Sequence, residues 1–326
     1  MKAVQFSRFG GPEVLEIVER PTPQPGPGEV LVRVRAAGVN YFETLMRRKL
    51  YAVTPELPMV PGVEVAGEIE AVGEGVDAAL RGARVAVPMF AVGRPNGGYA
   101  EYLAVDAASV VTLPDGLSFE HAVALLVPGL TALHLVRRSL PQGRTVLVTA
   151  AAGGVGSLLL QLARRAGAVR VIAVAGGAEK LDAAHVLGAD FGVDYREPGW
   201  AARVREATGG RGADIVYDTV GGTVTRACLD ALAPAGELVF AALGRYELTV
   251  AELEGMFFRN QSLKGFALLP LLTPESLRAD LAELFGLAAA GTLTVTVGGR
   301  YRLDQAAEAH RVLEERRSTG KIVLMP

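Results

Sequence analysis

The chain has 326 residues, half of them apolar, with 33 basic and 35 acidic residues and a formal net charge of -2. This length and composition predict about two domains with buried cores, and the dispersed charge excludes a basic face for nucleic acid or a membrane surface. Residues 1–6 run straight into a strand pattern, no apolar run approaches membrane-spanning length and Cys228 is the only cysteine, which favours a cytoplasmic protein without signal peptide, membrane span or internal disulfide.

Turn-forming residues divide the first third of the chain into short strands. The turns lie at residues 10–12 and 21–28, and alternating or nearly alternating apolar residues predict strands at 29–35, 63–72, 83–87 and 99–105. This spacing predicts an antiparallel, partly barrel-like β domain. Ser118, followed by Glu120, predicts the start of an apolar helix that reaches about residue 138, with the domain boundary in or just before it.

Strands and helices alternate from residue 145 onward. The predicted strands are 145–149, 170–174, 190–193, 214–218, 237–242 and 262–267, and the predicted helices include 157–166, 199–208 and 223–232. Such alternation is typical of a parallel, doubly wound α/β sheet. The spacing does not give the partner of the last predicted elements, which are the helix 274–290, the strand 293–297, the helix 304–316 and the strand 321–324.

The glycine-rich segment after the strand 145–149 is the first candidate binding site. It reads Ala151, Ala152, Gly153, Gly154, Val155, Gly156, and an apolar helical pattern follows. Glycines allow the sharp turn, the close approach of a pyrophosphate and the packing of the helix on its strand. The helix N-terminus offers N–H groups and a positive dipole end to phosphates. Because Ala151 replaces the first glycine of the G-x-G-x-x-G pattern, an ordinary glycine turn is the alternative.

The end of the next strand indicates which dinucleotide would bind. A site for NAD carries an acidic residue there for the ribose 2′-hydroxyl group. This chain has Ala175, Gly176 and Gly177 instead, with Lys180 one helical turn further on. A cation without a carboxylate at that position favours the 2′-phosphate of NADPH. The alternative is that Lys180 is a solvated helix residue.

Seven short motifs resemble, in their order and spacing, those of the medium-chain dehydrogenase/reductase superfamily, in particular its zinc-free quinone oxidoreductase or zeta-crystallin-like branch. They are residues 25–28, 38–40, 61–67, 98–102, 150–156, 212–218 and 320–324. The resemblance implies a discontinuous, GroES-like β-rich catalytic domain of residues 1–125 and 268–326, and an NADPH-binding Rossmann domain of residues 126–267. It also implies a homodimer paired through the strand 262–267.

The same resemblance bears on the chemistry. Zinc-dependent relatives place a cysteine near Gly38 and a histidine just before Glu64, whereas this chain has Asn40 and Val63 there. Glu64 alone cannot hold Zn²⁺, and no ligand spacing is seen among the four histidines, His121, His134, His185 and His310. Without a metal to lower the pKa of an alcohol, we expect hydride transfer from NADPH to a quinone. The alternatives are an enone or enoyl-thioester reductase and a catalytically silent NADPH-binding structural or regulatory protein.

Two candidate catalytic residues follow from the resemblance. Asn40 matches a residue beside the nicotinamide and would orient the cofactor or a substrate oxygen. Tyr51 matches a tyrosine facing the acceptor, whose hydroxyl group would donate to a developing oxyanion. A turn asparagine and a purely interfacial aromatic are the alternatives. Leu45 stands where some quinone reductases have another tyrosine, and Glu43 replaces a more usual aspartate; both leave the acceptor open and indicate a more apolar pocket.

The resemblance also implies cofactor contacts besides the glycine segment. These are Thr131, Gly176, Lys180, Tyr195, Leu243 and Arg316. Thr131 would meet the nicotinamide region, unless its hydroxyl group bonds back to its own helix. Arg316, in the last helix, would reach the 2′-phosphate. The alternatives are a paired surface arginine and a role for Arg317 instead.

Overall fold

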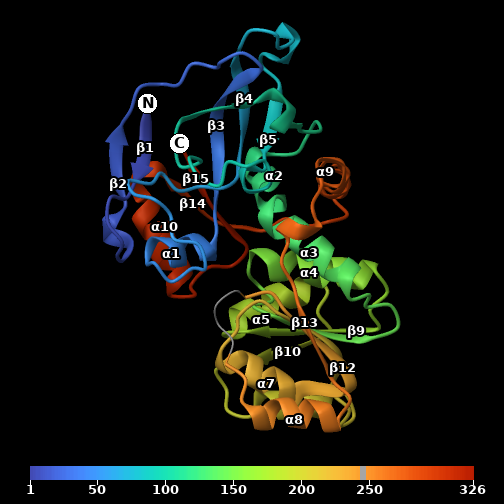
Figure 1. Ribbon diagram of the computed structural model, residues 1–326. Coiled ribbons are helices and arrows are strands. Elements are labelled where there is room, and N and C mark those ends of the chain that lie inside the picture. Colours follow the sequence, from blue (N-terminus) through green and yellow to red (C-terminus); the bar gives the residue numbers. More distant parts are fainter. Residues whose placement is uncertain (243–246) are drawn as a thin grey trace. The chain divides into compact units, whose positions relative to one another are not determined.

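The computed structural model describes residues 1–242 and 247–326, which form two compact units. Unit 1 consists of Met1–Val127 and Leu272–Pro326, and unit 2 of Pro128–Leu271. The chain therefore completes the first unit only after it has built the second (Figure 1).

Unit 1 is built on a mainly antiparallel β sheet. Its strands are β1 (Lys2–Gln5), β2 (Glu16–Glu19), β3 (Glu29–Val39), β4 (Val65–Val72), β5 (Arg84–Val87), β6 (Tyr102–Asp106), β7 (Val111–Thr112), β14 (Val297–Arg302) and β15 (Lys321–Met325). β1 and β2 form a separate pair, and the larger sheet has the order β14-β15-β3-β4-β5-β7, with β6 also paired to β3. Ile322 lies opposite Val39 in the antiparallel pair of β15 and β3, so the last strand starts beside the end of β3.

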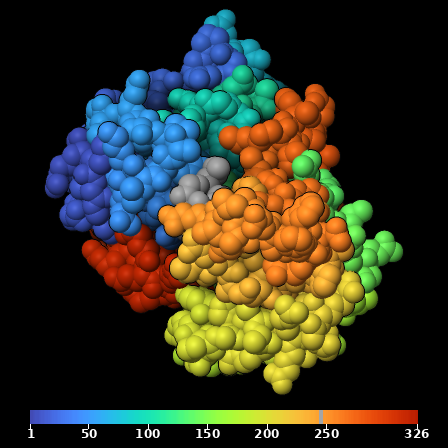
Figure 2. Space-filling model, turned by 60° about the horizontal axis from the view of Figure 1, so that its bottom comes forward, coloured from blue at the N-terminus to red at the C-terminus, as the bar shows by residue number. Residues whose placement is uncertain are grey.

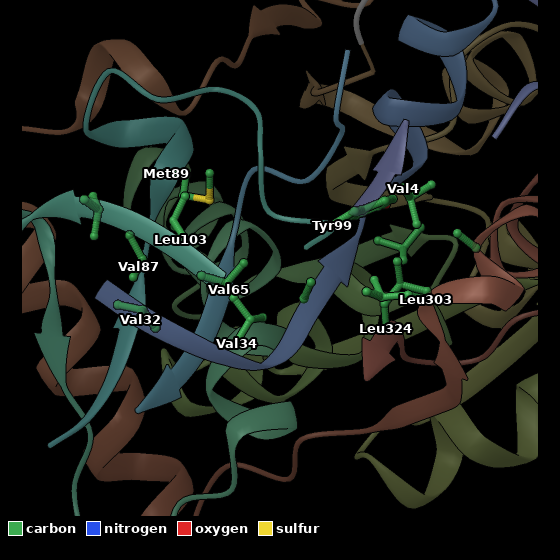
Figure 3. Packing of buried hydrophobic residues seen from close by; sticks show 14 of the residues in the cluster. Val4, Val32, Val34, Val65, Val87, Met89, Tyr99, Leu103, Leu303 and Leu324 are labelled. Atoms are coloured by element: carbon green, nitrogen blue, oxygen red, sulfur yellow. The ribbon is translucent and has the colours of Figure 1, made fainter. Parts of the chain in front are cut away.

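The core of unit 1 joins the two separated parts of the chain. Val32 and Val34 of β3 are buried in one cluster with Leu303 and Leu324 from the C-terminal part (Figure 3). Burial of each such side chain contributes roughly 1.5–3 kcal/mol. The C-terminal segment is thus an integral part of this domain.

Four α-helices of unit 1 surround this sheet or lie beside it. They are α1 (Tyr41–Arg47), α2 (Phe119–Leu125), α9 (Pro274–Ala289) and α10 (Ala306–Glu314). The side chain of Ser118 accepts a hydrogen bond from the His121 N–H, which confirms the predicted start of α2. The predicted continuous helix to residue 138 was wrong, because the chain breaks at Leu126 before α3 (Val127–Arg138). Pro128 lacks an N–H and its ring clashes with the preceding turn, which accounts for the break.

Unit 2 contains a six-stranded parallel sheet with helices on both faces. Its strands are β8 (Thr145–Thr149), β9 (Arg170–Ala175), β10 (Phe191–Asp194), β11 (Ala213–Asp218), β12 (Leu232–Phe240) and β13 (Ser262–Gly265). Its further helices are α4 (Gly154–Arg165), α5 (Ala178–Val186), α6 (Trp200–Ala207), α7 (Thr223–Ala231) and α8 (Val250–Phe258). In the view of Figure 1, α3 and α4 lie above the sheet and α7 and α8 below it.

The strand order of this sheet is β10-β9-β8-β11-β12-β13. The chain moves outward from β8 to β10 and then crosses back to β11, so β8 and β11 are neighbours at the point where the direction of winding reverses. Ligands of such sheets bind at the carboxyl ends of the strands at this switch point. The predicted fold class, a Rossmann sheet with a discontinuous GroES-like β domain, is confirmed.

Two elements near the C-terminus differ from the prediction. The strand expected at 293–297 begins at Val297, and the helix expected to reach Arg316 ends at Glu314. Gly298 and Gly299 resemble a turn in the sequence, but a Cβ atom on Gly298 would lie 1.3 Å from the Thr319 carbonyl oxygen. Glycine is therefore required inside this strand by the close approach of a neighbouring backbone. Helices α1 and α8 were not predicted.

One segment of the described chain, Phe119–Arg138, is long and apolar enough by composition to cross a membrane, although none was predicted from the sequence. Of the 18 consecutive residues that are most apolar in this segment, 72% are buried inside the protein. A core helix of a globular protein shows the same combination of apolar composition and burial.

Candidate functional site

The glycine segment of unit 2 forms the turn between β8 and α4. Ala150 has a left-handed backbone with a φ of 46°, and Gly153 is the N-cap of α4. A Cβ atom on Gly156 would lie 2.3 Å from the Ala150 carbonyl oxygen, so the close packing of α4 on this turn requires glycine. The first turn of α4 contains no acidic residue. Its backbone N–H groups, at the switch point of the sheet, therefore fit a pyrophosphate.

A second glycine turn follows the neighbouring strand β9. A Cβ atom on Gly176 would lie 3.0 Å from the Tyr195 hydroxyl oxygen, which places this ring directly against the turn. Gly177, with a φ of 98°, is the N-cap of α5, and Lys180 lies in the first turn of that helix. The structure thus brings Gly176, Tyr195 and the start of the helix with Lys180 together at the end of β9.

An ion pair at this turn was not predicted from the sequence. The Asp194 carboxylate accepts a hydrogen bond from the Gly177 N–H at 2.9 Å and pairs with the Arg196 guanidinium group at 2.6 Å. Hydrogen bonds from Arg196 are the main cause that lowers the pKa of Asp194 to about 2. Arg196 also lies over the turn, since a Cβ atom on Gly177 would be 2.8 Å from its Nη2 atom. The spacing Asp-x-Arg directly after a predicted strand was the available signal.

The other expected cofactor contacts lie on different elements of the two units. Thr131 is half-buried in α3 of unit 2. Leu243 lies outside the described residues. Arg316 is exposed in unit 1, two residues beyond the end of α10, where its φ of 55° is left-handed. Arg317 forms ion pairs with Glu308 and Glu315.

In unit 1, Asn40 joins a buried group of polar side chains at the end of β3. The Lys321 ammonium group donates to Asn40 Oδ1 at 2.6 Å and to Glu64 Oε1. Asn40 Nδ2 donates to Glu64 Oε1 at 2.8 Å, and Glu64 Oε2 accepts from the Val127 N–H at 2.7 Å. Lys321, Glu64 and Asn40 are 3%, 0% and 7% exposed. We call these three residues the Asn40 triad; the sequence motifs contained its members, but only the pairing of β15 with β3 brings them together.

The backbone of Asn40 is also held. Glu43, in the first turn of α1, accepts hydrogen bonds from the Asn40 N–H at 2.7 Å and the Gly62 N–H at 2.9 Å. Tyr99 donates to the same carboxylate at 3.2 Å. Burial raises the pKa of Glu43 to about 7, and the hydrogen bond from the Asn40 backbone opposes this shift. Glu43, which stands in place of the family's more usual aspartate, thus has a structural role: its carboxylate holds the backbone of Asn40.

A chain of hydrogen bonds continues from Glu43 to α10. Arg47 can only donate, so its 3.1 Å contact makes Nδ1 of His310 an acceptor. Burial, followed by the charge of Arg47, lowers the pKa of His310 to about 3, so the ring is neutral and carries its proton on Nε2. That N–H donates to the Tyr99 hydroxyl oxygen at 3.2 Å, and Tyr99 donates to Glu43. Every donor in this chain points toward Glu43.

Tyr51 lies apart from this network in an apolar environment. Its ring stacks on Phe42, with 5.5 Å between the ring centroids, and packs against a cluster that contains Phe6, Met46 and Met59. Burial raises the pKa of its hydroxyl group, which therefore keeps its proton at neutral pH. Tyr51 is a hydrogen-bond donor that could also release a proton to a stronger base.

The chain is similar to enzymes over its whole length. The profile of the family described as zinc-binding dehydrogenase matches residues 187–324, and that of the alcohol dehydrogenase GroES-like domain matches residues 26–115. The quinone oxidoreductase of Pseudomonas aeruginosa is 41% identical over 332 aligned residues, which cover 100% of this chain and 99% of that protein. This chain belongs to the quinone oxidoreductase family of medium-chain dehydrogenases/reductases.

Solved structures of this family resemble the chain closely. A mycobacterial protein solved in complex with NADPH is 39% identical, with a TM-score of 0.88 and 100% coverage of both chains. The Escherichia coli quinone oxidoreductase complexed with NADPH is 33% identical, with a TM-score of 0.89 and 100% coverage of both chains. As a member of the quinone oxidoreductase family, the chain is an oxidoreductase.

The description of one matching family includes zinc, so the fit of this metal to the residues matters. In the described part of the chain, no cluster of three or more histidine, cysteine, aspartate or glutamate residues is placed to hold a metal ion. Asn40 and Val63 are poor zinc ligands, and the Glu64 carboxylate is engaged by Lys321. These residues do not fit a catalytic zinc ion.

Proposed function

We propose that the protein is an NADPH-dependent, metal-independent oxidoreductase that transfers hydride to a quinone. The Asn40 triad carries the proposal, because the resemblance places a zinc ligand of the metal-dependent relatives near Asn40, and the Asn40 amide is here bound to the Lys321 ammonium group and the Glu64 carboxylate. The names of the relatives support the quinone, and the two solved complexes support NADPH. Two glycine turns with Lys180 and Arg196 nearby supply N–H groups and positive charge for the phosphates of this cofactor.

NADPH supplies the hydride. The quinone takes up this hydride and one proton and leaves as the hydroquinone, while NADPH becomes NADP⁺. The protein has to hold both reactants in contact, exclude water and stabilise the negative charge that develops on the quinone oxygen. Asn40 and Tyr51 are the proposed donors to that oxygen.

The proposal is tested by following NADPH oxidation with a quinone, an enone and an enoyl thioester as separate acceptors. We expect turnover on the quinone with a kcat/KM at least about tenfold above either other acceptor, unchanged after treatment with a metal chelator. Turnover on the enoyl thioester without turnover on the quinone would make the enzyme an enoyl reductase. Tight NADPH binding without reduction of any acceptor would favour a structural or regulatory role.

We further propose that the protein is a cytoplasmic homodimer. β13 is an edge strand of the parallel sheet, and its Leu263 side chain is 40% exposed. Four apolar side chains that are more exposed than Leu263 lie on α8, the helix before β13: Val250, Leu253, Phe257 and Phe258. The orange atoms of this part of the chain are uncovered on the face shown in Figure 2. Exposed strand edges and apolar patches favour association, here with a second copy of the chain.

A further inference from the structure

The carboxamide of Asn40 can adopt only one of its two flipped orientations. Lysine ammonium groups only donate hydrogen bonds, and ionised carboxylates only accept them. Asn40 contacts one group of each kind: its Oδ1 is 2.6 Å from the Lys321 ammonium nitrogen, and its Nδ2 is 2.8 Å from Glu64 Oε1. A flip would place the NH₂ group against the ammonium and the carbonyl oxygen against the carboxylate. Both contacts would then be repulsive, within a site that is almost completely buried.

We propose that Lys321 and Glu64 are positioning residues that hold Asn40 as a hydrogen-bond donor toward the carbonyl oxygen of the acceptor. Oδ1 is occupied by Lys321, and one N–H of Nδ2 is used on Glu64. The second N–H of Nδ2 is therefore the hydrogen-bond donor that remains for a ligand. Its natural partner is an oxygen that gains negative charge during hydride transfer, which quinones and enones both provide. This inference rests on the proposed function and names the groups that orient its donor.

The backbone around the triad is shaped to keep these contacts in place. A Cβ atom on Gly38 would lie 2.2 Å from Glu64 Oε1, so only glycine leaves room for the carboxylate. Gly320, directly before Lys321, has a φ of 61°, and a Cβ atom there would lie 2.2 Å from the Thr296 carbonyl oxygen. Because β15 is hydrogen-bonded to β3 beside Asn40, the lysine reaches the amide from a fixed strand. The donor is therefore oriented before the acceptor binds, which strengthens charge stabilisation.

The test compares Lys321→Met with Lys321→Gln. The two new side chains have similar size and both remove the charge, but only glutamine can still donate to Asn40 Oδ1. We expect Lys321→Met to lower kcat/KM for the acceptor at least about tenfold while the Kd for NADPH changes less than about twofold. Lys321→Gln should lose several-fold less. Lys2→Met, at an exposed position of the same unit, is the matched control and should behave as wild type.

Two kinetic outcomes would overturn the inference. One is a Lys321→Met variant with kcat/KM within about twofold of wild type, and the other is an equal loss in the Met and Gln variants, which would indicate packing alone. If Lys321→Met does not fold, the double variant Glu64→Gln/Lys321→Met replaces it, because it removes both buried charges. The new glutamine side chain must accept from the Val127 N–H and so turns its own NH₂ group toward Asn40, which favours the flipped amide. The same loss is expected, and wild-type activity would again refute the inference.

A spectroscopic readout separates this inference from the proposed function. The chain contains three asparagines, Asn40, Asn96 and Asn260, so selective ¹⁵N-asparagine labelling gives three side-chain NH₂ signals. The Asn40 signal is assigned by its loss in Asn40→Asp. We expect its hydrogens to exchange with solvent at least about tenfold more slowly than those of the exposed Asn96, and at least about tenfold faster in Lys321→Met than in wild type. Equal exchange in wild type and Lys321→Met would contradict the positioning role, even if no acceptor were turned over.

Discussion

At the scale of single residues, Tyr51 is the proposed donor with the simplest chemistry. Burial raises the pKa of its hydroxyl group, so the proton is present throughout the neutral range. If this group donates to the developing oxyanion, Tyr51→Phe should lower kcat for quinone reduction by about tenfold or more, by loss of one hydrogen bond in the transition state. NADPH affinity and thermal stability should stay close to wild type. Unchanged turnover in steady-state assays would remove Tyr51 from the mechanism.

At the scale of structural elements, the turn before α4 depends on Gly156. A Cβ atom there would lie 2.3 Å from the Ala150 carbonyl oxygen, whereas one on Gly286 of α9 would meet no atom within 4 Å. Gly156→Ala should therefore lower the free energy of unfolding by about 1–3 kcal/mol, because helix or turn must shift, and should weaken NADPH binding.

Gly286→Ala is the matched control in a helix. The same change there should raise the free energy of unfolding by about 0.5–1 kcal/mol, since alanine favours the helix. Denaturant titrations of both variants measure whether the free energy of unfolding falls in Gly156→Ala and rises in Gly286→Ala. Equal effects of the two substitutions would show that the packing of α4 on its turn does not require glycine.

A second element-scale prediction concerns Glu43, which links the start of α1 to Tyr99. Its pKa in the folded protein is raised to about 7, so the folded state binds a proton that the unfolded state has released above about pH 4.5. The contribution of Glu43 to stability is therefore complete below pH 4.5 and is lost as the pH rises to about 7. His310 has the opposite sign: its lowered pKa makes stability increase with pH up to about 6.5.

The experiment compares wild type with Glu43→Gln, so that all other titrating groups cancel. The free energy of unfolding of wild type minus that of the variant should decrease by about 1–3 kcal/mol between about pH 4.5 and 7. Denaturant titrations at several pH values measure it. A difference that is constant, or that increases with pH, would show that the folded-state pKa of Glu43 is not raised.

At the scale of the whole molecule, the sequence predicted the parallel sheet and most of its strands, because buried parallel strands give long apolar runs separated by turns. It could not give the pairing of β15 with β3, since contacts between residues such as Asn40 and Lys321 depend on the completed sheet. The sequence also did not indicate the role of Arg196. Its position over Gly177 depends on the pairing of two neighbouring strands, β9 and β10, just beyond whose ends the two residues lie. The fold class was thus readable from the pattern, and the supporting contacts of the site were not.

The proposed dimer belongs to the same scale. Light scattering at micromolar concentration should give the mass of two chains for wild type. Leu263→Glu, on the edge strand β13, should give the mass of one chain. Dimer formation would bury the new carboxylate in an apolar interface, and the loss of its hydration would oppose association. Val186→Glu is the matched control: this exposed residue ends α5, which packs against β9 and β10 at the opposite edge of the sheet. A monomeric wild type would contradict the proposal.

The central claim, a cofactor site built for NADPH, is tested most directly by titrating wild type and Lys180→Ala with NADPH and NADH. A charge-assisted contact to the 2′-phosphate is worth roughly 1.5–3 kcal/mol, or about 10- to 150-fold in affinity. Wild type should therefore bind NADPH at least about tenfold more tightly than NADH, with a smaller gap at high salt. Lys180→Ala should weaken NADPH alone, and Lys2→Ala should change neither affinity. Equal affinities for the two cofactors in wild type, or equal losses in Lys180→Ala, would contradict this account.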